Sequence, residues 1–184
     1  MAYFLYSAFA DEASADIQAH IAACKQNGIG AIELRNVNGK NISDFTVAEA
    51  EALKETLDKA GIRVSSIGSF YGKIEITDPF APHFEAFKNT VAVAKVLGAP
   101  YIRIFSFYFR NGEDHAAYRD EVFARLSAMA DYANENGVLC CHENERGIYG
   151  DITERCVEIA EYLGDRLGCI FDPANYIQIG RAHV

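Results

Sequence analysis

The chain has 184 residues, 50% of them hydrophobic and 23% charged, and a net charge of −9. This length and composition are typical of one globular domain with a substantial core, and no apolar run reaches the roughly 18 residues of a membrane span. The acidic balance argues against binding to nucleic-acid phosphates, and the first residues carry no basic leader, so we expect a cytoplasmic protein without nucleic-acid or membrane partners.

Short β-branched and aromatic runs alternate along the chain with longer stretches of helical spacing. The predicted strands are residues 4–9, 31–35, 63–70, 101–107, 138–143 and 168–172. The predicted helices between them are residues 15–27, 47–60, 82–97, 116–136 and 152–163.

Glycines and capping residues support these boundaries. A glycine takes the left-handed position after a helix without a Cβ penalty. Thr46 with Glu49 fits a capping box at a helix start, and Asp151 with Glu154 is a looser version of it. Each predicted helix ends at a glycine shortly before the next strand: Gly28, Gly61, Gly98, Gly137 and Gly164.

The alternation of strand and helix predicts an α/β fold with parallel strands covered by helices. The βα unit recurs about every 30 residues, as in a (β/α) barrel of the TIM type. The first βα turn, residues 8–14, lacks the glycine-rich phosphate fingerprint of a dinucleotide-binding domain. We therefore expect a TIM-type barrel with six parallel strands in chain order, each followed by an outer helix except the last.

The five cysteines form no CxxC pair, and their number is odd. This spacing is untypical of a zinc ribbon or a disulfide framework. Each lies in an apolar stretch, where a free thiol packs as a small hydrophobic group. All five are predicted to be reduced and structural, in agreement with a cytoplasmic location: Cys24, Cys140, Cys141, Cys156 and Cys169.

Polar side chains end the predicted strands, where barrel enzymes carry their chemistry. The run "HENERG", residues 142–147, follows directly on an apolar strand, although burying charge without a partner is costly. We expect these groups to face one polar cavity. The strand ends carry Asp11 and Glu12, Glu33 and Arg35, Ser69, Arg103 and Ser106, residues 142–145, and Asp172 with Asn175.

Three segments, "IELR", "CHENERGIYGD" and "CIFDPANY", resemble the sugar phosphate isomerase/epimerase family of xylose-isomerase-like barrels. The resemblance implies a divalent metal at the barrel mouth, with Glu143 and Asp172 as ligands and a His and a Glu from strands seven and eight. Two carboxylates suit Mn²⁺ or Mg²⁺, with Zn²⁺ as an alternative. Asn175 occupies a position that helps hold substrate or the metal site in relatives.

The activity that the resemblance implies is isomerisation or epimerisation of a sugar or sugar phosphate. The metal stabilises an enediolate, and Glu143 takes the proton next to the ketose carbonyl. Each assignment has an alternative. Glu143 and Asp172 can instead form ion pairs with Arg103 or Arg146, and Glu33 can pair with Arg35 or Arg103. The substrate-binding candidates are Glu33, Arg103, His142 and Asn175, of which His142 can instead be a hydrogen-bonded pocket residue.

The sequence departs from the family pattern because it contains six predicted strands rather than eight. We expect residues 1–180 to form one barrel-type domain without the last two βα units, and residues 181–184, with His183, to be a foreign or truncated tail. Whether such a chain is an active enzyme stays open. The alternative hypotheses for its function are an endonuclease-IV-like DNA repair enzyme and a non-catalytic remnant that binds a polyol or assembles into oligomers.

An open barrel leaves sheet edges and interior residues uncovered, which favours association. We therefore expect a homo-oligomer, or aggregation, with little isomerase activity. The residues expected to be uncovered are Phe4, Tyr6, Ile104, Cys169 and Phe171.

Overall fold

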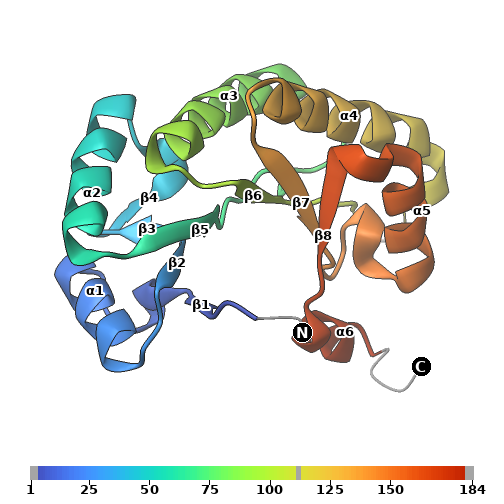
Figure 1. The fold of residues 1–184 in the computed structure, drawn as a ribbon. Coiled ribbons are helices and arrows are strands. Elements are labelled where there is room, and N and C mark those ends of the chain that lie inside the picture. The colour runs from blue at the N-terminus through green and yellow to red at the C-terminus, as the bar shows by residue number, and fades with distance from the viewer. Residues whose placement is uncertain (1–3, 111–112, 181–184) are drawn as a thin grey trace. The chain divides into compact units, whose positions relative to one another are not determined.

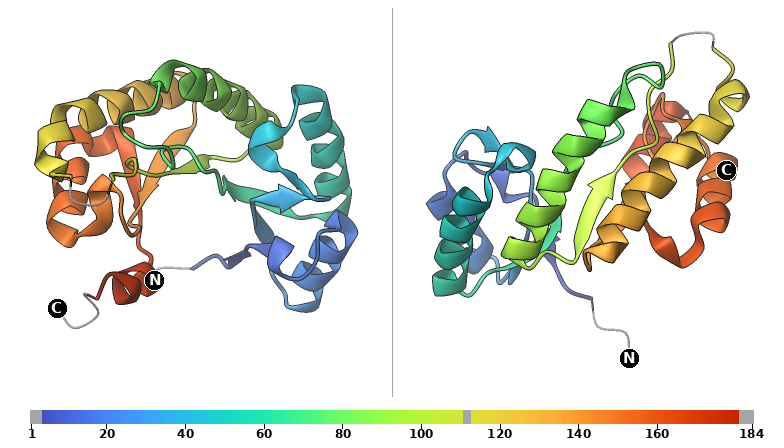
Figure 2. Two further views of the ribbon diagram at one scale, coloured as in Figure 1. Left: turned by 180° about the vertical axis from the view of Figure 1, so that it is seen from behind. Right: turned by 90° about the horizontal axis from the view of Figure 1, so that it is seen from above.

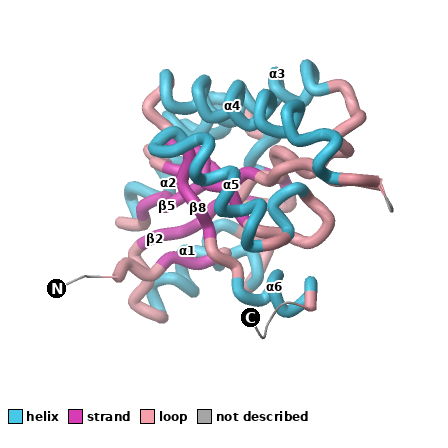
Figure 3. The backbone as a smooth tube through the Cα atoms, turned by 90° about the vertical axis from the view of Figure 1, so that its right-hand side faces the viewer, coloured by secondary structure: helices cyan, strands magenta, loops and turns pink. Residues whose placement is uncertain are grey.

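The computed structural model describes residues 4–110 and 113–180. The chain divides into two compact units, one of Met1–Ser69 with Ala86–Ile102 and the other of Phe70–Glu85 with Arg103–Val184. Helix α3 (Phe80–Leu97) and strand β6 (Tyr101–Ile104) each contribute residues to both units. Strands and helices alternate along the chain, as the sequence predicts, and Figure 3 colours the two classes separately.

The first unit carries parallel strands in chain order. Strands β1 (Ser7–Ala8), β2 (Ala31–Leu34) and β5 (Arg63–Ile67) pair successively, and β5 pairs with the first residues of β6. Helices α1 (Ile17–Gln26) and α2 (Val47–Ala60) follow β1 and β2 (Figure 1). The alternation of apolar side chains buries Ile32, Leu34 and Ile67 in this unit's core, together with Leu57 of α2.

The second unit carries the end of β6, then β7 (Leu139–Glu143) and β8 (Leu167–Ile170), again in chain order. β7 and β8 are parallel, with Glu143 opposite Ile170. Helix α4 (Arg119–Glu135) packs against β7 and helix α5 (Thr153–Leu163) against β8, beside the strands in Figure 2. The six parallel strands and their order confirm the predicted fold class.

Several local predictions are confirmed and one is wrong. The glycines that end the predicted helices all have positive φ. The capping box of Thr46 and Glu49 is present at the start of α2. The looser box of Asp151 and Glu154 is wrong, because Ile152 is the N-cap of α5 and makes no side-chain cap bond. Asp151 instead pairs with Arg155, one turn later.

Apart from short 3₁₀ helices, two features of the described residues were not predicted. The first is an antiparallel hairpin of β3 (Asn36–Val37) and β4 (Lys40–Asn41), joined by Asn38 and Gly39, both with positive φ. An Asn-Gly pair is a strong hairpin signal, but the strands are too short to show periodicity. The second is helix α6 (Pro173–Ile179), so the prediction that no helix follows the last strand is wrong. Its Asp-Pro start provides an N-cap and a proline at N1.

Most of the side chains predicted to be uncovered are exposed. Phe4 is 86% exposed and Phe171 is 74% exposed, and Tyr6 and Cys169 are exposed as well. Ile104 is fully buried, so the prediction for this residue is wrong, because it packs within the core of the second unit. All five cysteines are free, as predicted, and Cys169 is exposed, as predicted for a residue left uncovered. Among the described helices, none has the length and apolar character needed to cross a membrane.

Candidate active site

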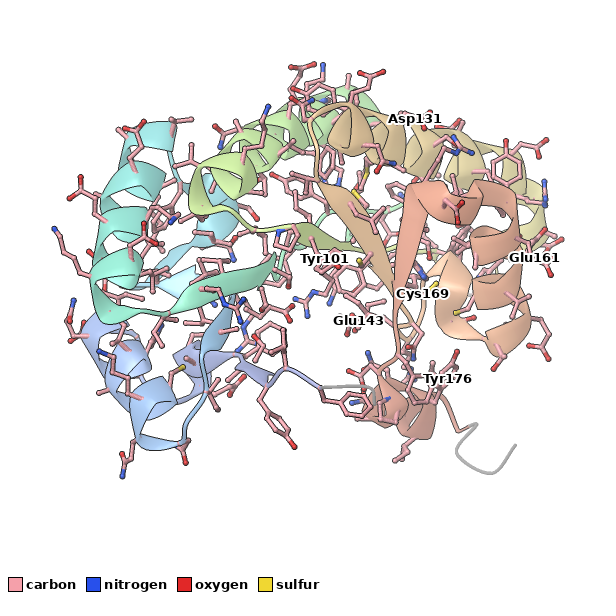
Figure 4. The ribbon with its side chains drawn as sticks, viewed as in Figure 1. Tyr101, Asp131, Glu143, Glu161, Cys169 and Tyr176 are labelled. Atoms are coloured by element: carbon pink, nitrogen blue, oxygen red, sulfur yellow. The ribbon has the colours of Figure 1, made fainter. Side chains whose placement is uncertain are left out.

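Two carboxylates lie at the carboxyl ends of neighbouring strands in the second unit. Glu143 is the last residue of β7 and is 6% exposed. Asp172 follows β8 and is the N-cap of α6, where its Oδ1 accepts from the backbone nitrogens of Ala174 at 2.8 Å and Asn175 at 3.1 Å. Figure 4 labels Glu143 near the end of β7, on the side where α6 begins. The structure therefore brings the two predicted metal ligands to the same end of the sheet.

Two asparagines, Asn175 and Asn144, form hydrogen bonds around these carboxylates. Asn175 donates from Nδ2 to Glu143 Oε1 at 3.3 Å and to the backbone oxygen of Asn144 at 2.8 Å. Asn144 donates from Nδ2 to the backbone oxygen of Asp172 at 2.9 Å and accepts from the Asp172 nitrogen at 2.8 Å through Oδ1. Asn175 was a predicted site residue. Asn144 was expected among the polar strand-end residues, but no role was predicted for it.

Arg103 forms a buried ion pair with Glu143. Its Nη1 lies 3.1 Å from Oε2, and both side chains are 9% exposed. The ion pair that the sequence left open as an alternative is therefore present. Burial raises the pKa of Glu143, the Arg103 guanidinium lowers it and the Asp172 carboxylate raises it, so that the pKa lies above its ordinary value.

A second ion pair lies next to Arg103. Lys73 Nζ is 2.5 Å from Glu145 Oε2, and both side chains are about three-quarters buried. The Lys73 ammonium lies 4.2 Å from the centre of the Phe105 ring, and the Arg103 guanidinium lies 5.2 Å from the same ring. Sequence reasoning did not place Lys73 at the site, because it lies on a loop and no pattern relates it to β7.

His142 occupies a different environment from Glu143. Because neighbouring residues of a strand point to opposite faces, the side chain of His142 points away from that of Glu143. The His142 Nε2 lies 2.9 Å from the Ser106 hydroxyl. The same hydroxyl accepts from the Gly150 nitrogen at 2.8 Å. His142 also lines a cavity of about 330 Å³ with Cys156, Cys169 and other residues of α5, β8 and α6. Its predicted role in substrate binding stays a prediction.

The buried imidazole should make stability depend on pH. Burial lowers the pKa of His142 to about 4, from 6.5 in the unfolded chain. Between these values the unfolded chain binds more protons, so stability is complete above pH 6.5 and falls as the pH is lowered. Between pH 7 and pH 4, the unfolding free energy of wild type should fall by about 3 kcal/mol more than that of His142→Gln. Urea unfolding at each pH measures both values. Equal losses in the two proteins would contradict a neutral buried His142.

Glu33 lies on β2 in the first unit and is half-buried. The ion-pair partners recorded for Arg35 are Asp11, at 2.8 Å, and Glu12. Burial raises the pKa of Asp11, but hydrogen bonds from Arg35 and Asn36 outweigh this effect and the pKa is lowered. The role of Glu33 in substrate binding stays a prediction.

The donor chemistry fits part of a divalent metal site. Among residues 4–110 and 113–180, no group of three or more His, Cys, Asp and Glu side chains is placed to hold a metal ion. Glu143 and Asp172 supply two carboxylates of the kind that Mg²⁺, Mn²⁺ and Zn²⁺ accept. Further ligands would have to come from water, substrate or other residues. His183 lies outside the described residues.

The solved structures that share this fold include the following three. The IOLI protein, crystallised with a zinc atom, has a TM-score of 0.76 at 15% identity, over 96% of this chain and 64% of its own. L-Ribulose 3-epimerase has a TM-score of 0.72 at 18% identity, over 97% of this chain and 63% of its own. The probable 3-DHS dehydratase AsbF from Bacillus anthracis has a TM-score of 0.72 at 13% identity, over 96% of this chain and 70% of its own.

At these identities the similarity establishes the fold, and the chain spans 63–70% of the length of these solved chains. No curated protein matches the chain in sequence. A family model described as "Xylose isomerase-like TIM barrel" matches residues 21–183, which is most of the chain. The chain therefore belongs to the xylose isomerase-like TIM barrel family.

Proposed function

We propose that this chain contributes the active site of a metal-dependent isomerase or epimerase that moves a proton next to the carbonyl of a sugar or sugar phosphate. The observation that carries the proposal is the pair of carboxylates, Glu143 and Asp172, held in one hydrogen-bond network at the ends of β7 and β8. The family and the fold shared with L-ribulose 3-epimerase support this substrate class.

Glu143 is the proposed base. Its raised pKa makes the ionised carboxylate a stronger base than an exposed glutamate. Arg103 and Asn175 each contact one of its two oxygens and so fix the direction in which the carboxylate points. These two residues are also the proposed contacts to substrate oxygens, while the substrate-binding roles of Glu33 and His142 stay predictions.

Glu143 and Asp172 would hold the cation, which we propose to be Mn²⁺ or Mg²⁺, with Zn²⁺ as the alternative that the zinc in the IOLI protein supports. A bound cation polarises the substrate carbonyl and makes the neighbouring C–H more acidic. The ion pair with Arg103 partly balances the charge of Glu143, so the guanidinium and the cation compete for this carboxylate.

Proton exchange tests the proposal more sensitively than net turnover. The protein is incubated in D₂O with Mn²⁺ and a panel of ketoses and ketose phosphates, and deuterium next to the carbonyl is measured by NMR. We expect incorporation that stops with EDTA and in Glu143→Gln but persists in Glu145→Gln. The absence of incorporation from every substrate with Mn²⁺, Mg²⁺ and Zn²⁺ would contradict the proposal.

The other readings are tested separately. A DNA repair activity would require binding to DNA, which the net charge of −9 disfavours. A non-catalytic remnant would bind a polyol without exchanging its protons. Location in the cytoplasm and assembly into a homo-oligomer stay predictions.

A further inference from the structure

The side chain of Asn144 makes two reciprocal hydrogen bonds with the main chain of Asp172. Its Oδ1 accepts from the Asp172 nitrogen at 2.8 Å, and its Nδ2 donates to the Asp172 oxygen at 2.9 Å. These bonds resemble one rung of a β-ladder, made by a side chain where the ladder between β7 and β8 has ended. Asn144 is 3% exposed, so this amide is held in place by the surrounding protein.

The same residue is also connected to Glu143. The Asn144 backbone oxygen accepts from Asn175 Nδ2, and that amide reaches Glu143 Oε1 as well. Asn175 in turn donates its backbone nitrogen to the Asp172 carboxylate. The two carboxylates are thus attached to one hydrogen-bonded unit, whose centre is Asn144.

We propose that Asn144 is a positioning residue, which fixes the separation of the Glu143 and Asp172 carboxylates and so sets the affinity of the site for a divalent cation. The inference rests on the proposed function, since it requires these carboxylates to be cation ligands. Asn144 contacts neither carboxylate directly. It acts through the Asp172 main chain on one side and through Asn175 on the other.

The matched variants are Asn144→Ala, Asn144→Asp and Asn134→Ala. Asn134 makes the same kind of bond, from Nδ2 to the backbone oxygen of Arg166 at 2.8 Å, away from the carboxylates. Asn144→Asp keeps an acceptor for the Asp172 nitrogen, loses the donor to its oxygen and adds a negative charge. Mn²⁺ affinity is measured from the broadening of amide NMR signals during a Mn²⁺ titration.

We expect Asn144→Ala to weaken Mn²⁺ binding by about tenfold or more, as for other residues that orient metal ligands, and Asn134→Ala to leave it within about twofold. Asn144→Asp should also bind more weakly despite its added charge. Urea unfolding in EDTA separates this effect from general instability, because a purely structural role changes stability and leaves the affinity of the folded protein unchanged.

The outcomes that overturn the inference are distinct. Unchanged affinity in folded Asn144→Ala, or tighter binding by Asn144→Asp, removes the positioning role and leaves the proposed function in place. If Asn144→Ala does not fold, the affinity of Asn144→Asp decides. Failure of wild type to bind any of Mn²⁺, Mg²⁺ and Zn²⁺ overturns both proposals together.

Discussion

The Glu143→Gln variant is expected to bind Mn²⁺ more than about 100-fold less tightly than wild type, because the loss of a ligand costs more than the loss of a residue that orients one. Glutamine keeps the size and one oxygen of the side chain but removes the charge that attracts the cation. Asp172→Asn should have a similar effect. Asparagine also caps helices well, so this variant should retain the start of α6.

Glu145→Gln is the matched control, because Glu145 is a neighbouring carboxylate that pairs with Lys73. Mn²⁺ affinity is measured by isothermal titration calorimetry, and circular dichroism checks that each variant is folded. If Glu145→Gln loses binding as severely as Glu143→Gln, then the general negative charge of the loop attracts the cation. The assignment of Glu143 as a specific ligand would then be wrong.

The Gly72→Ala variant is expected to lose about 3 kcal/mol or more of unfolding free energy. Gly72 has a φ of +90°, and a Cβ at this position would lie 1.9 Å from the backbone oxygen of Phe105. The backbone cannot move away easily. The Gly72 nitrogen donates to His83 Nε2 at 2.9 Å, and its oxygen accepts from the Phe107 nitrogen at 2.9 Å.

Gly137→Ala separates the two causes of this loss. Gly137 has a φ of +76°, and nothing lies within 4 Å of a Cβ built there. This variant should lose only the cost of the left-handed conformation, roughly 1 kcal/mol. Both values come from urea unfolding followed by circular dichroism. Equal losses in the two variants would mean that the backbones of Gly72 and Phe105 move apart enough to accommodate a Cβ.

The order of elements was predictable from the sequence because hydrophobic spacing and helix-ending glycines agree at every step. The hairpin at Asn38 and Gly39 and the helix after Asp172 were missed, although turn and capping signals mark both. These elements are too short for periodicity to reveal.

The site was predictable only in part. Motifs indicated Glu143 and Asp172, and the structure brings both together with Arg103 and Asn175, while their chemical roles stay predictions. The part played by Asn144 depends on the register of β7 and β8, which places its amide opposite the Asp172 main chain. No local pattern in the sequence encodes that register. The ion pair of Lys73 with Glu145 joins residues 72 positions apart, and no local sequence pattern predicts it.

Asp172 is both a candidate ligand and the residue that starts α6. A helix of seven residues does not persist alone in water, so the order of α6 depends on its cap and its packing. Asn175, which reaches Glu143, lies on that helix. Any ligand that draws the Asp172 carboxylate away from the backbone nitrogens it caps therefore works against the helix that carries Asn175. Local folding and ligand recognition are then parts of one equilibrium, and the helicity of residues 173–179 reports on both.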